Sequence, residues 1–472
     1  MKAIRFAALA LSLTVFAAVA QALPPQDRRG TAAPHAQDTD LLDMDVVKAM
    51  SIALRENLMV LSAQSRLESA KGRRKTASSA LGPMLSLQGQ GGAYDNIPRQ
   101  PDNDLSARVA VSQNLYSGGA NQARSRQGKL GVKQAEQSLA DMKETVAQSV
   151  WNAFYDVLFR LEVVHAQNDA LEYYTNAEKV LTSGRSSGLD LSRVRQQKEN
   201  ARSQSYAAVN NLGASRIELC RLLRLPPQTQ FNLAGSLEEG LPSVEEASAL
   251  PDDPAGELKE TLARRSDYQA LITARDSKAQ DITIAKSGLR PSLLLTSAYR
   301  FGYRSNGQPA GQSPMEPPPS DSENQWIATL TLNVPVFDNG ATSGRVRTAR
   351  GELEAAEHAV AEKEERVRSE IATNWLSLQN ALASLAASRA SVKRAQESLK
   401  LAESGYRKRG NTQIDVLQTR NDLTNALQQQ AMALKNARFA QGALWKAQGV
   451  FTEKAFRTPV DKQAGRKEKP SR

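Results

Sequence analysis

Residues 341–408 decide the fold: ATSGRVRTARGELEAAEHAVAEKEERVRSEIATNWLSLQNALASLAASRASVKRAQESLKLAESGYRK. This stretch contains no proline, and apolar residues return at every seventh position. These positions are Val346, Leu353, Val360 and Val367, then after a step of four Ile371, Leu378, Leu385, Val392 and Leu399. Sevenfold spacing keeps one apolar stripe facing a partner helix, and the four-residue step locally unwinds the supercoil. The stretch therefore predicts a coiled-coil-like helix of roughly 100 Å.

The same pattern occurs earlier in the chain, at residue numbers lower by 221 (353 minus 132). Its members are Val132, Leu139, Val146, Val150, Val157, Val164 and Leu171. The four-residue step falls at the corresponding place in both copies. A repeated pattern with the same interruption indicates an internal duplication, so the predicted fold consists of two repeats.

The composition suits long, thin helices. Only 5% of the 472 residues are aromatic, and the single cysteine, Cys220, cannot form an internal disulfide. The formal net charge is +11, but part of it lies near the amino terminus and in residues 453–472. The remaining charge is spread over the predicted helices, which indicates solvated surfaces and no nucleic-acid partner.

Residues 1–20 have the pattern of a secretory signal peptide. Lys2 and Arg5 precede an apolar run over residues 6–20, which ends in the small-residue pattern Ala-Val-Ala. An uncleaved membrane anchor is the alternative, although the run is short for a spanning helix. No cysteine lies directly after the cleavage site, so we expect no lipid anchor of the bacterial lipoprotein type.

The rest of the chain divides into five segments. We expect a flexible leader over 21–42, a first repeat over 43–225, an irregular connector over 226–256, a second repeat over 257–450, and a basic disordered tail over 451–472. Each repeat is predicted to contain a helix, a β-hairpin, a long helix and a returning helix. The connector is predicted to be irregular because it is rich in proline.

The two predicted hairpins span residues 84–116 and 291–337, where the hydrophobic period changes to two. One face of each strand is apolar and the other carries Ser, Thr, Asn, Gln and Arg. Such strands suit either a half-buried soluble sheet or a lipid-facing barrel with a wet interior. Four strands are too few to close a membrane barrel, and open strand edges are not viable in lipid. A membrane location therefore requires several chains in one barrel.

The order of these elements resembles the TolC-like outer-membrane efflux protein family over residues 43–450. Family-like local sequences lie at residues 81–83, 289–291, 333–340, 410–417 and 443–449. The resemblance implies a mainly α-helical chain with four β-strands. It implies a homotrimer with a 12-stranded transmembrane β-barrel in the outer-membrane lipid and an α-helical tunnel in the periplasm.

The resemblance also implies a function and partners. The chain is expected to be the passive exit duct of a tripartite efflux or type I secretion system. Its expected partners are a periplasmic membrane-fusion adaptor and an inner-membrane pump of the RND or ABC type. The sequence leaves open whether the cargo is a drug, a metal or a protein.

The family closes its tunnel near the periplasmic turns of the helices, and matching positions predict a gate here. The candidate gate residues are Tyr406, Asp415, Asp190, Gln418 and Arg409, and the candidate turn glycines are Gly184 and Gly410. Gly410 lies one position later than in the family, and Gln418 replaces a second aspartate that some members carry. Simple capping of helix N-termini is the alternative role for Asp190 and Asp415.

The sequence contains no pattern typical of an enzyme. His35, His165 and His358 lack metal-ligand spacing, and no phosphate-binding glycine loop follows a strand. We therefore predict no catalytic residue, cofactor or metal. A non-pore periplasmic coiled-coil scaffold or trimeric surface fibre is the alternative function. The repeated amphipathic hairpins distinguish the two, because a scaffold does not need them.

Overall fold

The computed structural model describes residues 42–94, 102–183, 188–243, 254–305, 321–408, 410 and 412–457. The chain divides into two units, residues 1–42 and 43–472. Apart from Leu42, where the first strand begins, every described residue belongs to the second unit. The predicted signal peptide and almost all of the predicted leader therefore lie outside the described residues.

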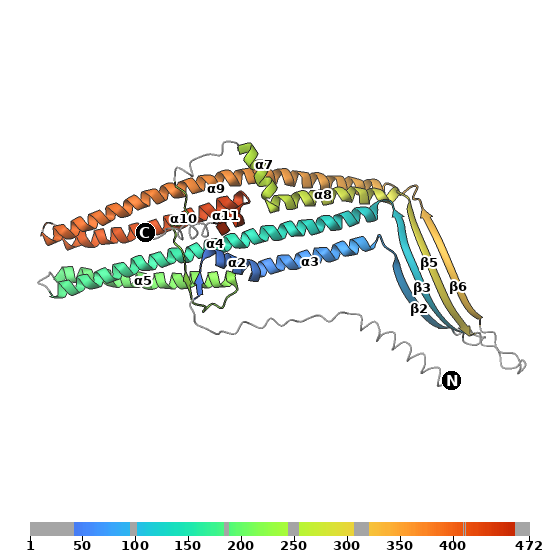
Figure 1. Ribbon diagram of the computed structural model, residues 1–472, viewed down its shortest axis with the longest axis horizontal. Coiled ribbons are helices and arrows are strands. Elements are labelled where there is room, and N and C mark those ends of the chain that lie inside the picture. Colours follow the sequence, from blue (N-terminus) through green and yellow to red (C-terminus); the bar gives the residue numbers. More distant parts are fainter. Residues whose placement is uncertain are drawn as a thin grey trace, which may run out of the picture. The chain divides into compact units, whose positions relative to one another are not determined.

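Long helices dominate the second unit (Figure 1). The helices of the first repeat are α2 (Val46–Glu56), α3 (Leu58–Ser79), α4 (Ala120–Ser183) and α5 (Gly188–Leu223). Those of the second are α7 (Pro254–Arg264), α8 (Ser266–Lys286), α9 (Ala341–Arg407), α10 (Gln413–Ala447) and α11 (Phe451–Arg457). The 67 residues of α9 correspond to about 100 Å, which confirms the predicted long helix.

Each long helix has a different partner along each half. Helix α9 lies beside α10 toward one end and beside α8 toward the strands, and α4 lies beside α5 and α3 in the same way (Figure 1). The sevenfold residues of α9 are buried over the half that faces α10, from Val367 to Leu399, apart from Ile371. Those nearer the strands, Val346, Leu353 and Val360, are half-buried.

Two predicted single helices are broken by polar residues. The helix expected from residue 43 to about 80 is interrupted at Asn57, whose amide donates to the carbonyl of Leu222 at 2.8 Å. The Asn57 side chain also accepts from the backbone of Met59 at 2.9 Å and so caps α3. Likewise, extended backbone at Arg265 (φ −70°, ψ 111°) separates α7 from α8. Asn57 and Arg265 are both buried, so each helix break lies where its side chain can contact neighbouring elements.

Three segments predicted to lack regular structure contain ordered elements. Strand β4 (Phe231–Leu233) lies in the segment expected to be irregular, and it pairs with β1 (Leu42–Met44), which begins inside the predicted leader. Helix α7 also begins inside that segment, at Pro254. The tail expected to be disordered from residue 451 begins with α11. Burial of Met44, Phe231 and Phe451, each at most 2% exposed, explains the ordered strands and α11. Residues 458–472 lie outside the described residues.

The remaining strands form one antiparallel four-stranded sheet, as predicted. Its strands are β2 (Met84–Tyr94), β3 (Asp102–Ser117), β5 (Ser292–Ser305) and β6 (Asp321–Asn333), in the order β2-β3-β5-β6. The central pair, β3 and β5, joins the two repeats, while β2 and β6 each have one edge that pairs with no other described strand. All four strands lie at one end of the helices (Figure 1).

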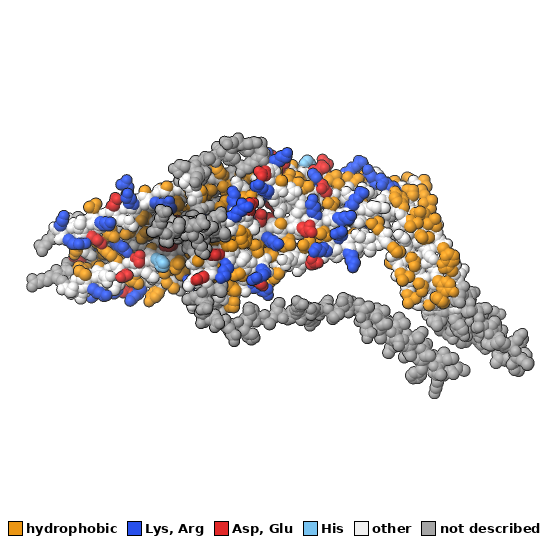
Figure 2. All heavy atoms as spheres, viewed as in Figure 1, with side chains coloured by type: hydrophobic (Ala, Val, Ile, Leu, Met, Phe, Trp, Pro, Cys, Tyr) orange, Lys and Arg blue, Asp and Glu red, His pale blue; other side chains and the backbone are white. Residues whose placement is uncertain are grey.

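One face of the sheet is an exposed apolar surface. Leu87, Val109, Tyr299 and Trp326 form a row across the four strands, each opposite the next in the register. Leu87 is 70% exposed and Trp326 is 67% exposed. Figure 2 shows hydrophobic side chains gathered over the strands, whereas charged side chains lie over the helices. A patch of this kind indicates contact with an apolar environment.

None of the helices among the described residues has the length and apolar character needed to cross a membrane.

Candidate functional site

The candidate gate lies at the helix ends farthest from the strands, where the hairpins α4–α5 and α9–α10 turn (Figure 1). Tyr406 lies in the last turn of α9, while Asp415 and Gln418 lie in the first turns of α10. Asp190 lies in the first turn of α5. The structure thus places these four candidates at the same end of the helices. Arg409 and Gly184 lie outside the described residues.

Asp415 forms a capping box with Thr412. The Thr412 backbone N–H and hydroxyl each donate to the Asp415 carboxylate at 2.8 Å. The Asp415 N–H donates to the Thr412 hydroxyl oxygen at 3.3 Å. The backbone bond and then the hydroxyl bond hold the pKa of Asp415 below its ordinary value, so this side chain remains ionised at neutral pH. Within one chain, Asp415 therefore stabilises the start of α10.

The other candidates have few contacts within one chain. Asp190 pairs with Arg193 of its own helix at 3.9 Å. No hydrogen bond joins Tyr406 to Asp190 among the described residues. Tyr406 is 37% exposed and Gln418 is also exposed. The N–H of Gly410 donates to the carbonyl of Gly405 at 2.9 Å and closes the end of α9. Tyr406 and Gln418 thus keep exposed surface within one chain.

Four contacting side chains near the tip were not predicted as functional. The Tyr173 hydroxyl on α4 donates to Glu403 on α9 at 3.2 Å, and the Tyr174 hydroxyl donates to Asn421 on α10 at 2.7 Å. The Arg420 guanidinium lies 4.8 Å from the centre of the Tyr173 ring. We call these four hydrogen-bonded residues the hairpin tie, because they join α4–α5 to α9–α10.

Burial keeps the tyrosines of the hairpin tie in their neutral form. Burial, followed by the charge of Glu403, raises the pKa of Tyr173, and burial raises that of Tyr174 to about 12. Both hydroxyls therefore remain donors at any physiological pH. The sequence alone does not predict these bonds, because it does not reveal acceptors more than two hundred residues away.

A second polar cluster, the Arg265 network, lies where α8 begins. Arg265 donates to Asp267 at 3.0 and 2.6 Å and to Glu370 of α9 at 2.6 Å. It also donates to the carbonyl of Ala447, the last residue of α10, at 3.2 Å, and Lys363 of α9 lies 2.7 Å from Asp267. The Arg265 side chain is only 9% exposed, so this network holds three helices together out of contact with most solvent.

Two carboxylates of α4, Asp141 and Glu144, lie beside the Arg265 network. Burial and then the charge of Asp267 raise the pKa of Asp141. Burial and then the charge of Asp141 raise the pKa of Glu144. The ionised forms of both groups are therefore disfavoured in the folded protein.

We predict that Glu144→Gln stabilises the protein at neutral pH. The raised pKa means that the contribution of Glu144 is present below its unfolded pKa and is lost as the pH rises through its folded pKa. The advantage of the variant should thus grow from acid to neutral pH, as measured by thermal loss of helical circular dichroism. Glu362→Gln, on an exposed side chain of α9, is the control and should show no such trend. A pH-independent difference for Glu144→Gln would contradict the prediction.

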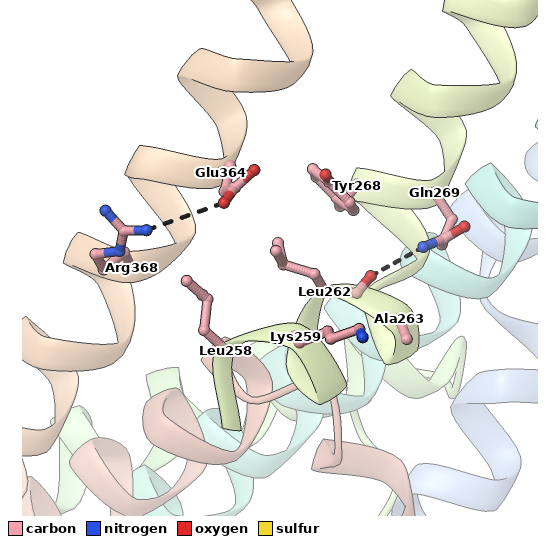
Figure 3. Close-up of a pocket in the computed structure, with 8 residues that line it drawn as sticks. All are labelled: Leu258, Lys259, Leu262, Ala263, Tyr268, Gln269, Glu364 and Arg368. Atoms are coloured by element: carbon pink, nitrogen blue, oxygen red, sulfur yellow. Dashed lines mark hydrogen bonds and ion pairs between the residues drawn. The ribbon is translucent and has the colours of Figure 1, made fainter. Parts of the chain in front are cut away.

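A hollow of about 710 Å³ lies between α7, α8 and α9 (Figure 3). Its lining includes Leu258, Leu262 and Tyr268, with Glu364 facing Arg368 at 3.9 Å on α9. This combination offers no nucleophile with a neighbouring base. Within the part of the chain that the structure describes, no group of three His, Cys, Asp or Glu residues is placed to hold a metal.

Comparisons with known proteins agree with this architecture. The model of the family "Outer membrane efflux protein" matches residues 49–223 and 258–450. The chain is 22% identical to TolC of Escherichia coli, with 88% of this chain and 86% of TolC covered. It is 26% identical to the efflux protein BepC of Brucella suis, but that match spans only 54% of this chain and 52% of BepC.

Solved structures show the same fold. CusC superposes with a TM-score of 0.73 at 18% identity, covering 88% of this chain and 95% of CusC. The open state of MtrE from Neisseria gonorrhoeae gives 0.72 at 16% identity, covering 88% and 91%. The family match spans most of the chain and confirms the resemblance predicted from the sequence. The chain belongs to the outer membrane efflux protein family and is a non-enzymatic outer-membrane channel of the tripartite efflux systems of Gram-negative bacteria.

Proposed function

We propose that the chain acts as a homotrimer whose three sheets form one 12-stranded barrel (three times four strands). The unpaired outer edges of β2 and β6 are the observation that carries this proposal. Lipid does not tolerate open strand edges, and pairing β6 of one chain with β2 of the next removes all of them. The apolar row that includes Leu87 and Trp326 then faces lipid, and the helices form a periplasmic tunnel.

In this assembly the protein is a passive duct. A periplasmic membrane-fusion adaptor joins it to an inner-membrane pump of the RND or ABC type, which supplies the energy. Planar-bilayer recording tests the proposal: the detergent-solubilised trimer should insert and give discrete conductance steps. A protein that sediments as a stable monomer and gives no steps would instead support the scaffold function.

The helical tip is proposed as the gate, held at two levels. Three copies of Asp190, Asp415 and Tyr406 surround the threefold axis, where the exposed Tyr406 side chain of one hairpin meets a neighbouring Asp190. Above the tip, the hairpin tie holds α4–α5 against α9–α10 through hydroxyl bonds. Opening requires the hairpins to separate, and each of these hydrogen bonds opposes the separation by about 1 kcal/mol, because water replaces the bond when it breaks.

We predict that Tyr173→Phe with Tyr174→Phe raises single-channel conductance severalfold. Both rings remain in place, but the bonds to Glu403 and Asn421 are lost, so the two hairpins separate more readily. Tyr206→Phe is the matched control, because this tyrosine of α5 is 65% exposed. Tyr406→Phe with Asp190→Ala tests the lower level in the same way. If this second variant forms trimers with unchanged conductance, Asp190 acts only at its helix end.

A further inference from the structure

The two central strands of the sheet, β3 and β5, each carry one arginine whose side chain the structure describes. Among the described side chains of all four strands, residues 84–91, 106–117, 292–302 and 325–333, only Arg108 and Arg300 are charged. These two arginines are direct partners in the pairing of β3 with β5. Both side chains are exposed within the chain. Like charges placed directly opposite each other on a sheet are destabilising, so this pair does not stabilise the sheet.

The register places the pair on the polar face of the sheet. Arg108 lies opposite Gln88 on its other side, and Arg300 lies opposite Gln325, which gives one polar row across all four strands. The neighbouring row, one residue along each strand, is the apolar row of Leu87, Val109, Tyr299 and Trp326. Successive strand residues point to opposite faces, so the arginines lie on the side away from the apolar surface.

Among the described side chains, no acidic group lies opposite or beside these arginines in the register. Toward the helices, the next row on the same face consists of Ala110, Ala298 and Ile327, which carry no charge. In the other direction the register places Glu323 one row outward, opposite Gly302. Two rows outward, the register places Arg304 between Asp104 and Asp321. In the part of the sheet whose side chains are described, the positive charge therefore lies at one level.

We propose that Arg108 and Arg300 form an anion-binding belt inside the barrel, an inference that rests on the proposed trimer. Two arginines per chain in three chains place six guanidinium groups at one level of the lumen. Arginine donates in a planar fork that matches phosphate and carboxylate oxygens, and it keeps its charge at every relevant pH. Rings of like-charged side chains attract counter-ions into pores. The ligand class is a multivalent anion, such as a polyphosphate or polycarboxylate.

Block of the channel by inorganic tripolyphosphate in planar bilayers tests the belt, with the probe added to each chamber in turn. The concentration for half block should rise about tenfold in Arg108→Gln with Arg300→Gln, because charge-assisted bonds are lost. Arg108→Lys with Arg300→Lys keeps the charge and should retain part of the block. Glu323→Gln removes the negative charge that the register places one row outward, and this change should strengthen the block.

A matched control makes the same change of charge far from the strands. Arg55→Gln with Arg202→Gln removes two exposed arginines of α2 and α5 and should leave the block unchanged. If the double glutamine variant of the strands forms too little trimer, the single variants should each show a smaller rise. Equal block in wild type and in all strand variants that conduct would overturn the belt. Absence of any conductance in the wild type would instead contradict the proposed channel assembly.

Discussion

Replacing Arg265 by methionine is expected to destabilise the protein by about 3 kcal/mol, because removing one partner of a buried ion pair leaves the others uncompensated. The change removes the bonds to Asp267, Glu370 and the Ala447 carbonyl together. Lys363 lies 2.7 Å from Asp267 and remains in the variant, so Asp267 keeps one positive partner and the loss of stability is limited. The expected result is a lower temperature for thermal loss of helical circular dichroism, measured in detergent at one scan rate.

The control for this prediction is Arg275→Met on α8, the helix that begins directly after Arg265. Arg275 also pairs with a neighbouring aspartate, Asp276, at 2.7 Å, but its side chain is 36% exposed. Exposed pairs contribute little, at most about 1 kcal/mol, so the control should melt close to wild type. Equal losses in the two variants would show that burial of the Arg265 network does not determine its contribution.

The Arg265 network should make the free energy of unfolding decrease in acid. Burial alone would raise the pKa of Asp267, but the bonds from Arg265 and Lys363 hold it well below its ordinary value. A lowered folded pKa contributes stability that is present above the unfolded pKa and is lost as the pH falls through the folded pKa. Part of this sensitivity should disappear in Arg265→Met, whose melting temperature should therefore fall less steeply in strong acid.

The sequence predicts the long helices and strands well because one simple period governs each. Val367, Leu378 and Leu385 repeat every seventh or eleventh residue and are all buried. The strands alternate, and Leu87 and Val109 lie opposite each other on the apolar face as the alternation predicts. Such patterns are local, so a single sequence reveals them without knowledge of the partner.

The missed features depend on contacts between distant parts of the chain. Asn57 breaks a predicted helix because its amide reaches the carbonyl of Leu222, 165 residues away. Tyr174 belongs to the hairpin tie because Asn421 lies against it, 247 residues away. Local propensity carries no information about either contact. At the candidate gate, the sequence offers helix capping as an alternative role for Asp415, and the structure shows its capping box with Thr412.

Trp151 is the centre of the core at the middle of the helices. Its side chain is fully buried, and its indole N–H donates to the carbonyl of Arg438 on α10 at 3.1 Å. The ring meets Tyr155 at 4.7 Å, Trp445 at 5.4 Å and Phe451 of α11 at 5.9 Å between centroids, each edge to face. One side chain thus joins α4, α10 and α11, including the helix that the sequence interpretation assigned to a disordered tail.

Trp151→Ala is expected to destabilise the protein by about 4 kcal/mol, because a large cavity remains in a rigid core. Trypsin should also cleave faster within α11, since Phe451 loses its aromatic partner. Tyr206→Ala removes an aromatic ring that is 65% exposed and should change neither measurement.

Gly442→Ala tests the same core by adding a methyl group instead of leaving a cavity. An added methyl group would lie 3.0 Å from the Trp151 indole nitrogen and 3.4 Å from the Phe451 ring. Overpacking at this site should cost about 2 kcal/mol, less than the cavity. If Trp151→Ala melts with wild type while Gly442→Ala does not, the core tolerates an empty space but not an added methyl, and the tryptophan does not hold α11 in place. Losses in both variants, with faster cleavage of α11 in Trp151→Ala, show that α11 is held against the helices by this ring.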